Sequence, residues 1–80
     1  MTLRVKITSP QKVIWEGTAN WVSSENSAGK FDILPMHANF ITIIEGKPIK
    51  IKTDTGVMDY SYPRSVLFTQ NNTVLIYTNI

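Results

Sequence analysis

The sequence predicts an all-β domain, a small flattened β-sandwich or barrel of about eight to ten short strands. Val, Ile and Thr make up 25 of the 80 residues, and their branched side chains suit a pleated strand better than a helix. Apolar and polar residues alternate with a period of two, as in Leu3–Ile7 and Ile49–Lys52. Turn signals recur at short intervals, with no helical periodicity between them. We therefore expect a single domain over residues 1–80.

The expected strands lie between these turn signals. The first strand is Leu3–Ile7, and the chain then turns at Ser9-Pro10. The later strands are separated by Glu16-Gly17, Asn26–Gly29, Pro35-Met36, Glu45–Pro48, Asp54–Gly56, Tyr62-Pro63 and Gln70–Asn72. One segment departs from this pattern, because Ser24–Lys30 is a polar stretch of seven residues. We expect it to form a loop, and loops longer than a hairpin needs often carry function.

Length, composition and charge exclude several classes of protein. A chain of 80 residues has a free energy of unfolding of about 4–12 kcal/mol, which argues against a buried catalytic cleft built from many residues. The absence of cysteine excludes a disulfide framework and a cysteine-ligated zinc module. The net charge of +2 points to no particular partner. We expect no export signal and no membrane span, because the longest mostly apolar run, Phe40–Ile44, is far shorter than the ~20 residues that cross a bilayer.

Two patterns resemble catalytic sites and are better explained by structure. His37 is the single histidine, and no serine lies in a nucleophile-elbow sequence that would complete a triad with Asp32 and His37. The tripeptide Asp54-Thr55-Gly56 matches the one that carries the carboxylate of aspartic proteases. That chemistry requires apolar flanks, whereas the flanks here are charged, with Lys50, Lys52 and Asp59. A β-turn is the simpler interpretation.

Nucleic-acid binding by a small barrel is an alternative function. The chain has eight aromatic residues and two basic pairs, Arg4/Lys6 and Lys50/Lys52. Stacking of bases requires aromatic and basic side chains on one outward face, and no lysine interleaves Tyr60 and Tyr62. We therefore rank this alternative, together with a β-sandwich adaptor that serves another complex, below the function described next.

Eight residues keep a characteristic order, namely Ser27, Gly29, Phe31, Ile33, Leu34, Pro35, His37 and Ala38. In this order, and in its first hairpin, the chain resembles the N-terminal β-sandwich of the epsilon subunit of F-type ATP synthase. Asp32 and Met36 stand where that family has glycine, and Arg64-Ser65 stands where it has a glycine pair. Because methionine is strained at positive φ, we expect an extended or right-handed backbone at Met36.

The resemblance implies a non-catalytic central-stalk subunit that links the gamma subunit to the membrane rotor ring and so couples ion translocation to ATP synthesis. By position, the gamma-subunit interface would contain Ser9, His37, Ala38 and Thr42, and the rotor-ring interface Ser27, Gly29 and Lys30. No metal or cofactor is implied. The implied location is the cytoplasmic side of an energy-transducing membrane, most simply a bacterial inner membrane, with attachment through the complex. Because the chain ends at Ile80 without a C-terminal helical hairpin, we expect neither nucleotide binding nor inhibition by hairpin insertion.

Three structural expectations follow from this interpretation. Trp15 and Trp21 should be at least partly buried, because each lies in a strand. The end of the molecule that carries His37 should be a surface, because a contact residue cannot be enclosed in the free domain. An apolar patch that includes Ile41, Phe40 or a neighbour should be exposed, because a stalk subunit is complete only in its complex.

Overall fold

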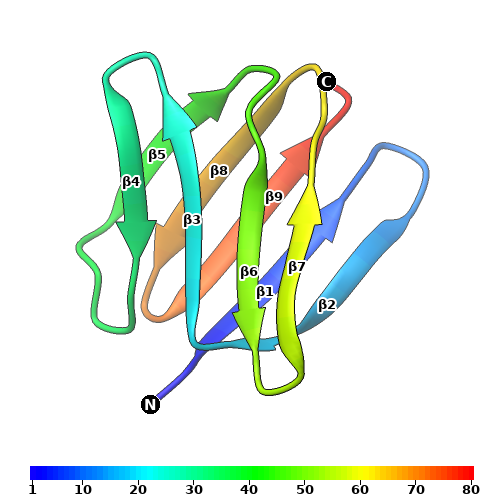
Figure 1. The fold of residues 1–80 in the computed structure, drawn as a ribbon. Helices are drawn as coiled ribbons and strands as arrows, with labels where there is room; N and C mark the ends of the chain where they lie inside the picture. The colour runs from blue at the N-terminus through cyan, green and yellow to red at the C-terminus, as the bar shows by residue number, and fades with distance from the viewer.

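A computed structural model describes all of residues 1–80 as nine β-strands without a helix (Figure 1). The strands, in chain order, are β1 (Leu3–Thr8), β2 (Val13–Ala19), β3 (Trp21–Asn26), β4 (Gly29–Ile33), β5 (Phe40–Ile44), β6 (Ile49–Thr53), β7 (Gly56–Tyr60), β8 (Ser65–Gln70) and β9 (Thr73–Thr78). They form two sheets packed face to face. The predicted β-sandwich is confirmed. No helix of the structure could span a membrane.

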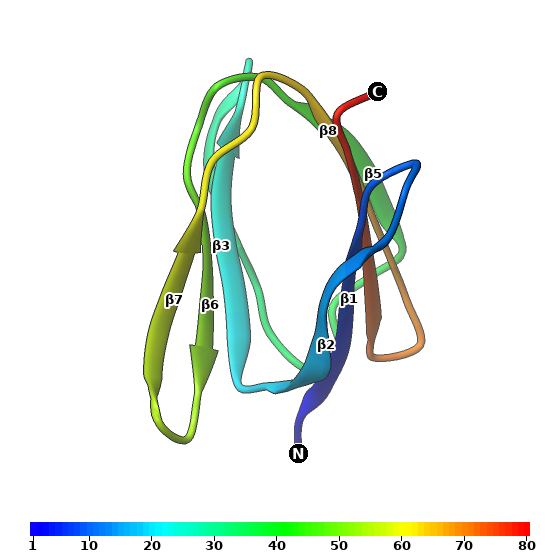
Figure 2. The same cartoon turned by 90° about the vertical axis from the view of Figure 1, so that its right-hand side faces the viewer.

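The larger sheet has the strand order β2-β1-β9-β8-β5 and the smaller sheet the order β4-β3-β6-β7. All neighbouring strands are antiparallel except β1 and β9, which run parallel inside the larger sheet. The first and last strands of the chain therefore lie side by side. Figure 2 shows the two sheets edge-on as separate layers. The chain crosses between the layers four times, after β2, β4, β5 and β7.

The core fills the space between the sheets with side chains that alternate inward along each strand. In β1, for example, Leu3, Val5 and Ile7 are buried while Arg4 is exposed. The buried apolar side chains are Leu3, Val5, Ile7, Ala19, Val22, Ile33, Ile44, Ile49, Ile51, Leu67, Val74 and Ile76. Burial of one such large side chain stabilises the fold by about 1.5–3 kcal/mol. No buried side-chain nitrogen or oxygen lacks a hydrogen-bond partner.

The prediction of a turn at Glu16-Gly17 is wrong. Strand β2 continues through both residues to Ala19, and Gly17 pairs with Val5 of β1. The glycine is needed for packing, since a Cβ atom at Gly17 would lie 2.8 Å from Cζ2 of Trp15. The chain reverses instead at Asn20, whose backbone N–H donates to the Lys52 carbonyl at 2.7 Å and thereby joins the two sheets.

The prediction of a seven-residue loop over Ser24–Lys30 is also wrong. Strands β3 and β4 stay paired as far as Asn26 and Gly29, which leaves only two residues in the turn. The Asn26 side-chain oxygen accepts the Ala28 N–H at 2.9 Å, and Gly29 adopts a φ of +126°. An asparagine that bonds the backbone two residues ahead, followed by glycine at positive φ, makes a tight hairpin.

The expectation of an extended or right-handed backbone at Met36 is wrong. Its φ is +72°, in the left-handed region. The His37 N–H donates to the Leu34 carbonyl at 3.1 Å, which closes a turn with Pro35 and Met36 at its centre. Positive φ at the third position, after proline, is characteristic of a type II turn. The Met36 N–H also donates to the Asn72 side-chain oxygen at 2.6 Å. The closure of this turn and the Asn72 contact hold the methionine in the strained region.

Replacing Met36 by glycine is therefore expected to raise the free energy of unfolding by about 1 kcal/mol, because glycine carries no Cβ penalty at positive φ. Little packing is lost, since the Met36 side chain is 76% exposed. Urea denaturation of both proteins measures the difference. The control is Met36→Ala, which removes the exposed side chain but retains the Cβ atom and should show no gain. Equal stabilities for Met36→Gly and Met36→Ala would contradict a strained turn.

Both tryptophans are half-buried, as predicted. Trp15 packs against the core cluster from β2, and its indole ring lies over Gly17. Trp21 lies on β3 and pairs with Lys52 of β6.

Candidate interaction surfaces

The outer side of the larger sheet carries an apolar face made by β5, β8 and β9. Strand pairing aligns its side chains in two rows across the strands. The rows are Ile43, Val66 and Tyr77, and Ile41, Phe68 and Leu75; we call these six residues the apolar face. Ile41 is 66% exposed and Ile43 and Tyr77 are 44% exposed, while the other three are half-buried. The expectation of an exposed apolar patch that includes Ile41 is confirmed.

The apolar face exists because β5, β8 and β9 are apolar on both sides. Residues 40–44, 66–68 and 74–77 read as nearly continuous apolar runs, in contrast to the strict alternation of β1. Such runs are the signal of a strand that is covered on both faces. Apart from Ile41, this face was not predicted from the sequence, although these three runs are a signal for it.

Charged residues border the apolar face on one side. Lys6 of β1 pairs with Leu75, and Glu16 of β2 pairs with Lys6. Arg4 and Glu16 form an exposed ion pair with 3.7 Å between their nitrogen and oxygen atoms. The outer side of the larger sheet is therefore divided into an apolar half and a charged half.

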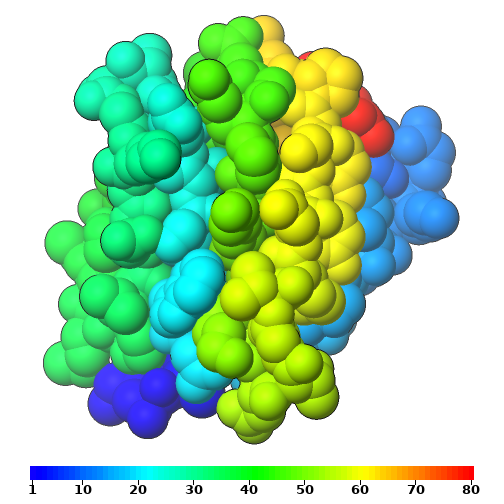
Figure 3. All heavy atoms as spheres, viewed as in Figure 1, coloured from blue at the N-terminus to red at the C-terminus, as the bar shows by residue number.

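The outer side of the smaller sheet has a different character. Asp32, Ser23, Lys50 and Asp59 lie in one row across its four strands, and the Ser23 hydroxyl donates to the Asp32 carboxylate. Figure 3, which views this side, shows the side chains of β3, β4, β6 and β7 covering it as one layer. The row contains two aspartates, one serine and one lysine, so it is polar and forms no uniformly basic stripe.

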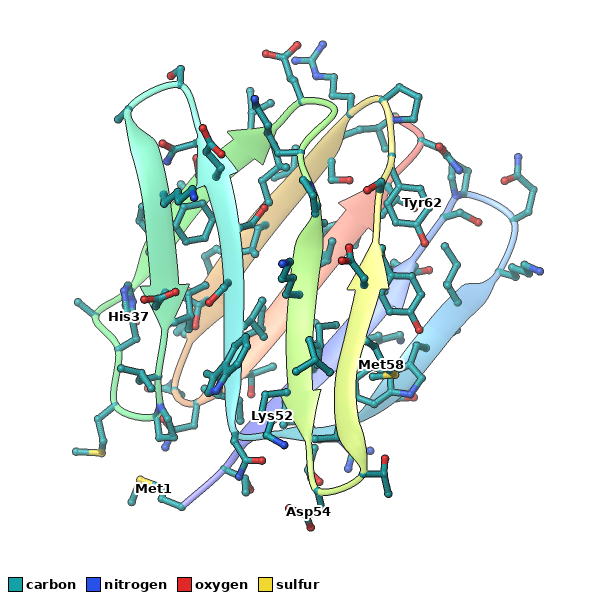
Figure 4. The ribbon with its side chains drawn as sticks, in the orientation of Figure 1. Met1, His37, Lys52, Asp54, Met58 and Tyr62 are labelled. Atoms are coloured by element: carbon teal, nitrogen blue, oxygen red, sulfur yellow. The ribbon has the colours of Figure 1, made fainter.

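The residues expected at the gamma-subunit interface lie around the apolar face rather than together. His37 and Ala38 lie in the connection between β4 and β5, and His37 is at the margin of the molecule in Figure 4. The His37 ring lies against Phe40 with 5.7 Å between ring centroids, and its Nδ1 atom is 2.7 Å from the Ala38 carbonyl oxygen. Ala38 is exposed and His37 is partly exposed. The expectation that this end is a surface is confirmed.

Ser9 lies on another part of the border, and Thr42 lies on β5 itself. Ser9 lies in the β1–β2 turn, where its hydroxyl oxygen accepts the N–H of Lys12 at 3.2 Å. Strands β9 and β8 separate β1 from β5, so the apolar face lies between Ser9 and His37. Thr42 points to the inner side of β5, where its hydroxyl oxygen accepts the Asn26 side-chain N–H at 3.0 Å. The outward side chains of β5 are its neighbours Ile41 and Ile43.

The residues expected at the rotor-ring interface do lie together. Ser27, Gly29 and Lys30 belong to the β3–β4 hairpin, and Lys30 is exposed opposite Glu25. This hairpin is at the start of β4, whereas His37 follows the end of β4. The hairpin and His37 are therefore at opposite ends of one strand, whereas Thr42 contacts the hairpin through Asn26.

An open groove of about 720 Å³ lies between the β3–β4 hairpin and β5. Its walls are Glu25, Asn26 and Ser27 on the hairpin side and Ile41 and Ile43 on the strand side. It is continuous with the apolar face through these two isoleucines.

The patterns considered for catalysis do not assemble into a site. Asp32 accepts its hydrogen bond from Ser23, and His37 contacts the Ala38 carbonyl, so they form no catalytic pair. Asp54 lies in the exposed β6–β7 turn, remote from His37 in Figure 4. No group of three or more His, Cys, Asp or Glu side chains could hold a metal ion. Chemistry at these residues has no structural support.

The opposite edge of the sandwich is closed by aromatic packing. Tyr60 and Tyr62 stack with 6.4 Å between ring centroids, and the Tyr60 hydroxyl lies 3.9 Å from the sulfur of Met58. Burial raises the pKa of Tyr62 above its usual value, and the neighbouring Tyr60 adds to this effect. The cluster packs against the core and is explained as structural.

Comparison with known proteins agrees with this architecture. Residues 2–79 match the family model of the β-sandwich domain of the ATP synthase delta/epsilon chain. The chain belongs to this family. The epsilon chain of the chloroplast ATP synthase of Bigelowiella natans is 41% identical over 54 residues, which are 68% of this chain and 39% of that protein. The cyanelle epsilon chain of Cyanophora paradoxa is 30% identical over 79 residues, which are 99% of this chain and 60% of that protein.

The delta/epsilon β-sandwich fold is also found in solved assemblies. A chain of the Euglena gracilis mitochondrial ATP synthase superposes with a TM-score of 0.87 at 12% identity, covering 96% of this chain and 50% of that chain. A chain of the Tetrahymena thermophila mitochondrial ATP synthase, in a structure of the central stalk and c-ring, gives a TM-score of 0.79 at 13% identity over 98% of this chain and 63% of that chain. The delta/epsilon domain described here thus spans about two fifths to three fifths of the relatives it matches.

Proposed function

We propose that this domain is a non-catalytic subunit of the central stalk of an F-type ATP synthase. It links the gamma subunit to the membrane rotor ring and so couples ion translocation to ATP synthesis. The observation that carries the proposal is the exposed apolar face. A subunit that binds a partner needs such a face, whereas a monomer that functions alone does not. The complex holds the domain at the surface of an energy-transducing membrane.

The gamma subunit occupies the apolar face in this proposal. Burial of Ile41, Ile43 and Tyr77, the three most exposed members, removes apolar area from water and supplies the main driving force. Ser9, His37 and Ala38 lie on the border of the face, where polar groups of an interface usually lie. Thr42 contributes from the inner side of β5 by holding the strand to Asn26.

The rotor ring contacts the β3–β4 hairpin in this proposal. Ser27, Gly29 and Lys30 form one corner, in which Ser27 and Lys30 are exposed. The positive charge of Lys30 favours acidic or carbonyl groups on the ring. The hairpin and the apolar face use different side chains, so both partners can be bound at once. A closely packed sandwich between them is stiff enough to transmit torque.

The test measures binding of the purified gamma subunit from the same source to the domain. Ile41→Asp and Tyr77→Asp should each weaken binding by roughly 100-fold or more, because a carboxylate is then buried in an apolar interface. Val57→Asp is the matched control, since Val57 is 53% exposed on the outer side of the smaller sheet. Lys30→Glu tests the hairpin and should leave gamma binding unchanged.

Circular dichroism confirms that each variant is folded before binding is compared. Gamma binding that is equally strong for all four variants would contradict docking on the apolar face. No binding by the folded wild-type domain would contradict the proposed partner itself.

A further inference from the structure

The four edge strands of the sandwich differ in how well they are protected against pairing with another chain. Edge strand β4 carries Lys30 and Asp32, and edge strand β7 carries Asp59. Edge strand β2 carries Glu16, and its register with β1 is irregular. Charges and irregularities of this kind prevent edge-to-edge association. Strand β5, residues 40–44, has no charge, proline or glycine, and it pairs with β8 without any shift.

The centre of β5 is symmetric about Thr42, with Ile41 on one side and Ile43 on the other. In an antiparallel pair of two copies, outward side chains can face outward side chains only if the pairing is centred on a single residue of the strand. Centring on Thr42 pairs all five residues of β5 and places Ile41 of one copy beside Ile43 of the other. Beyond the strand, Glu45 would face Asn39 and Lys47 would face His37. No two carboxylates and no two lysines are opposed.

The edge of β5 borders a groove whose other wall is the β3–β4 hairpin. The groove of about 720 Å³ runs past Ile41, Thr42 and Ile43, and no other strand of the chain pairs with this edge. Two-fold symmetry makes one patch serve both copies, which is the simplest way to close an assembly.

We propose that β5 is a self-association site: two copies of this chain pair their β5 strands antiparallel about Thr42 and join their larger sheets into one continuous sheet. This inference goes beyond the proposed function, because it concerns the domain in the absence of its partners. Pairing covers Ile41 and Ile43, which belong to the apolar face. The dimer therefore competes with docking of a partner on that face.

Sedimentation equilibrium of this chain alone tests the proposal. An interface this small belongs to the weak class, so we expect a Kd on the order of 100 µM, measured between about 10 µM and about 1 mM. Ile43→Lys should raise the Kd at least roughly tenfold, because a lysine on an edge strand opposes pairing. Tyr77→Lys is the matched variant, since both side chains are 44% exposed in the same row of the face. It should leave the Kd unchanged, because β9 is two strands away from the edge.

Cysteine cross-linking tests the register with a second measurement. The chain contains no cysteine, so single cysteines report one contact each. An equal mixture of Ile41→Cys and Ile43→Cys should form a disulfide-linked heterodimer under mild oxidation, because directly opposed residues have the Cα separation that a disulfide requires. Each variant alone should cross-link at least about tenfold more slowly.

Three results would overturn the proposal. The first is a chain that is monomeric at the highest concentration, which would leave the β5 edge to a different partner. The second is a dimer that Tyr77→Lys weakens as much as Ile43→Lys, which would indicate stacking of the apolar faces. The third is cross-linking of each cysteine variant with itself as fast as in the mixture. None of these results depends on whether the gamma subunit binds.

Discussion

Replacing Leu67 by alanine is expected to lower the free energy of unfolding by about 2–5 kcal/mol. Leu67 is 0% exposed and lies on β8 between Thr42 of β5 and Ile76 of β9. Its side chain fills the centre of the core, where the two sheets prevent collapse around a cavity. Because the free energy of unfolding of a chain of this length is only about 4–12 kcal/mol, this one truncation removes a large share of it. Urea denaturation followed by far-ultraviolet circular dichroism measures the loss.

The adjacent residue provides the control. Phe68 points to the opposite side of β8, is half-buried and belongs to the apolar face, so Phe68→Ala opens a dent to water rather than a closed cavity. We expect it to lower the free energy of unfolding by at most about 1.5 kcal/mol and to weaken gamma binding. A larger loss of stability for Phe68→Ala than for Leu67→Ala would contradict the register of β8.

Replacing Gly17 by alanine is expected to lower the free energy of unfolding by about 1–3 kcal/mol. The new Cβ atom would lie 2.8 Å from Cζ2 and 3.1 Å from Cη2 of Trp15, so the indole ring must leave its position. The backbone is not the cause, because Gly17 does not lie in the positive-φ region. Without the ring, alanine in a strand would even be favoured over glycine by its lower conformational entropy in the unfolded chain. Thermal unfolding together with a shift of the tryptophan emission to longer wavelength measures the effect.

A double-mutant cycle isolates the contact between Gly17 and Trp15. In a Trp15→Leu background the space above residue 17 is open, so Gly17→Ala should become neutral or stabilising. The same loss in both backgrounds would contradict the steric explanation and would place the cause of the Gly17 effect elsewhere in β2.

Prediction from the sequence places strands well where one face is buried and the other is exposed to solvent. In β1 and β6 the alternation is strict, and the predicted inward residues, such as Val5 and Ile51, are buried. It failed where a residue has a role that only a neighbour in space reveals. Gly17 was interpreted as a turn residue, because the indole ring above it belongs to a contact that the order of residues does not display.

Met36 shows a second limit of local reasoning. Steric preference alone opposes methionine at positive φ, and the expectation followed that preference. The structure overrides it through the hydrogen bond from the Met36 N–H to Asn72, a residue in the β8–β9 turn. The stability of this turn therefore depends on two segments that are far apart in the sequence, the β4–β5 connection and the β8–β9 turn.

The two candidate interaction surfaces also differ in how far the sequence could predict them. The β3–β4 hairpin with Ser27, Gly29 and Lys30 is local in the sequence, so the residues identified together there also lie together. The apolar face requires β5, β8 and β9 to be neighbours, and its rows join residues such as Ile43 and Tyr77 that no motif connects.

The sequence by itself determined the class of fold, the family and most of the strand positions, because β-branched composition, period-two alternation and turn residues are local properties of a chain. Only the tertiary structure decided which strands are neighbours, which of them are edge strands and which side of β5 is exposed to solvent. These depend on the order of strands in the two sheets, which is set by the packing of all inward side chains at once. The apolar face and the unprotected β5 edge therefore became visible only when the strands were placed side by side.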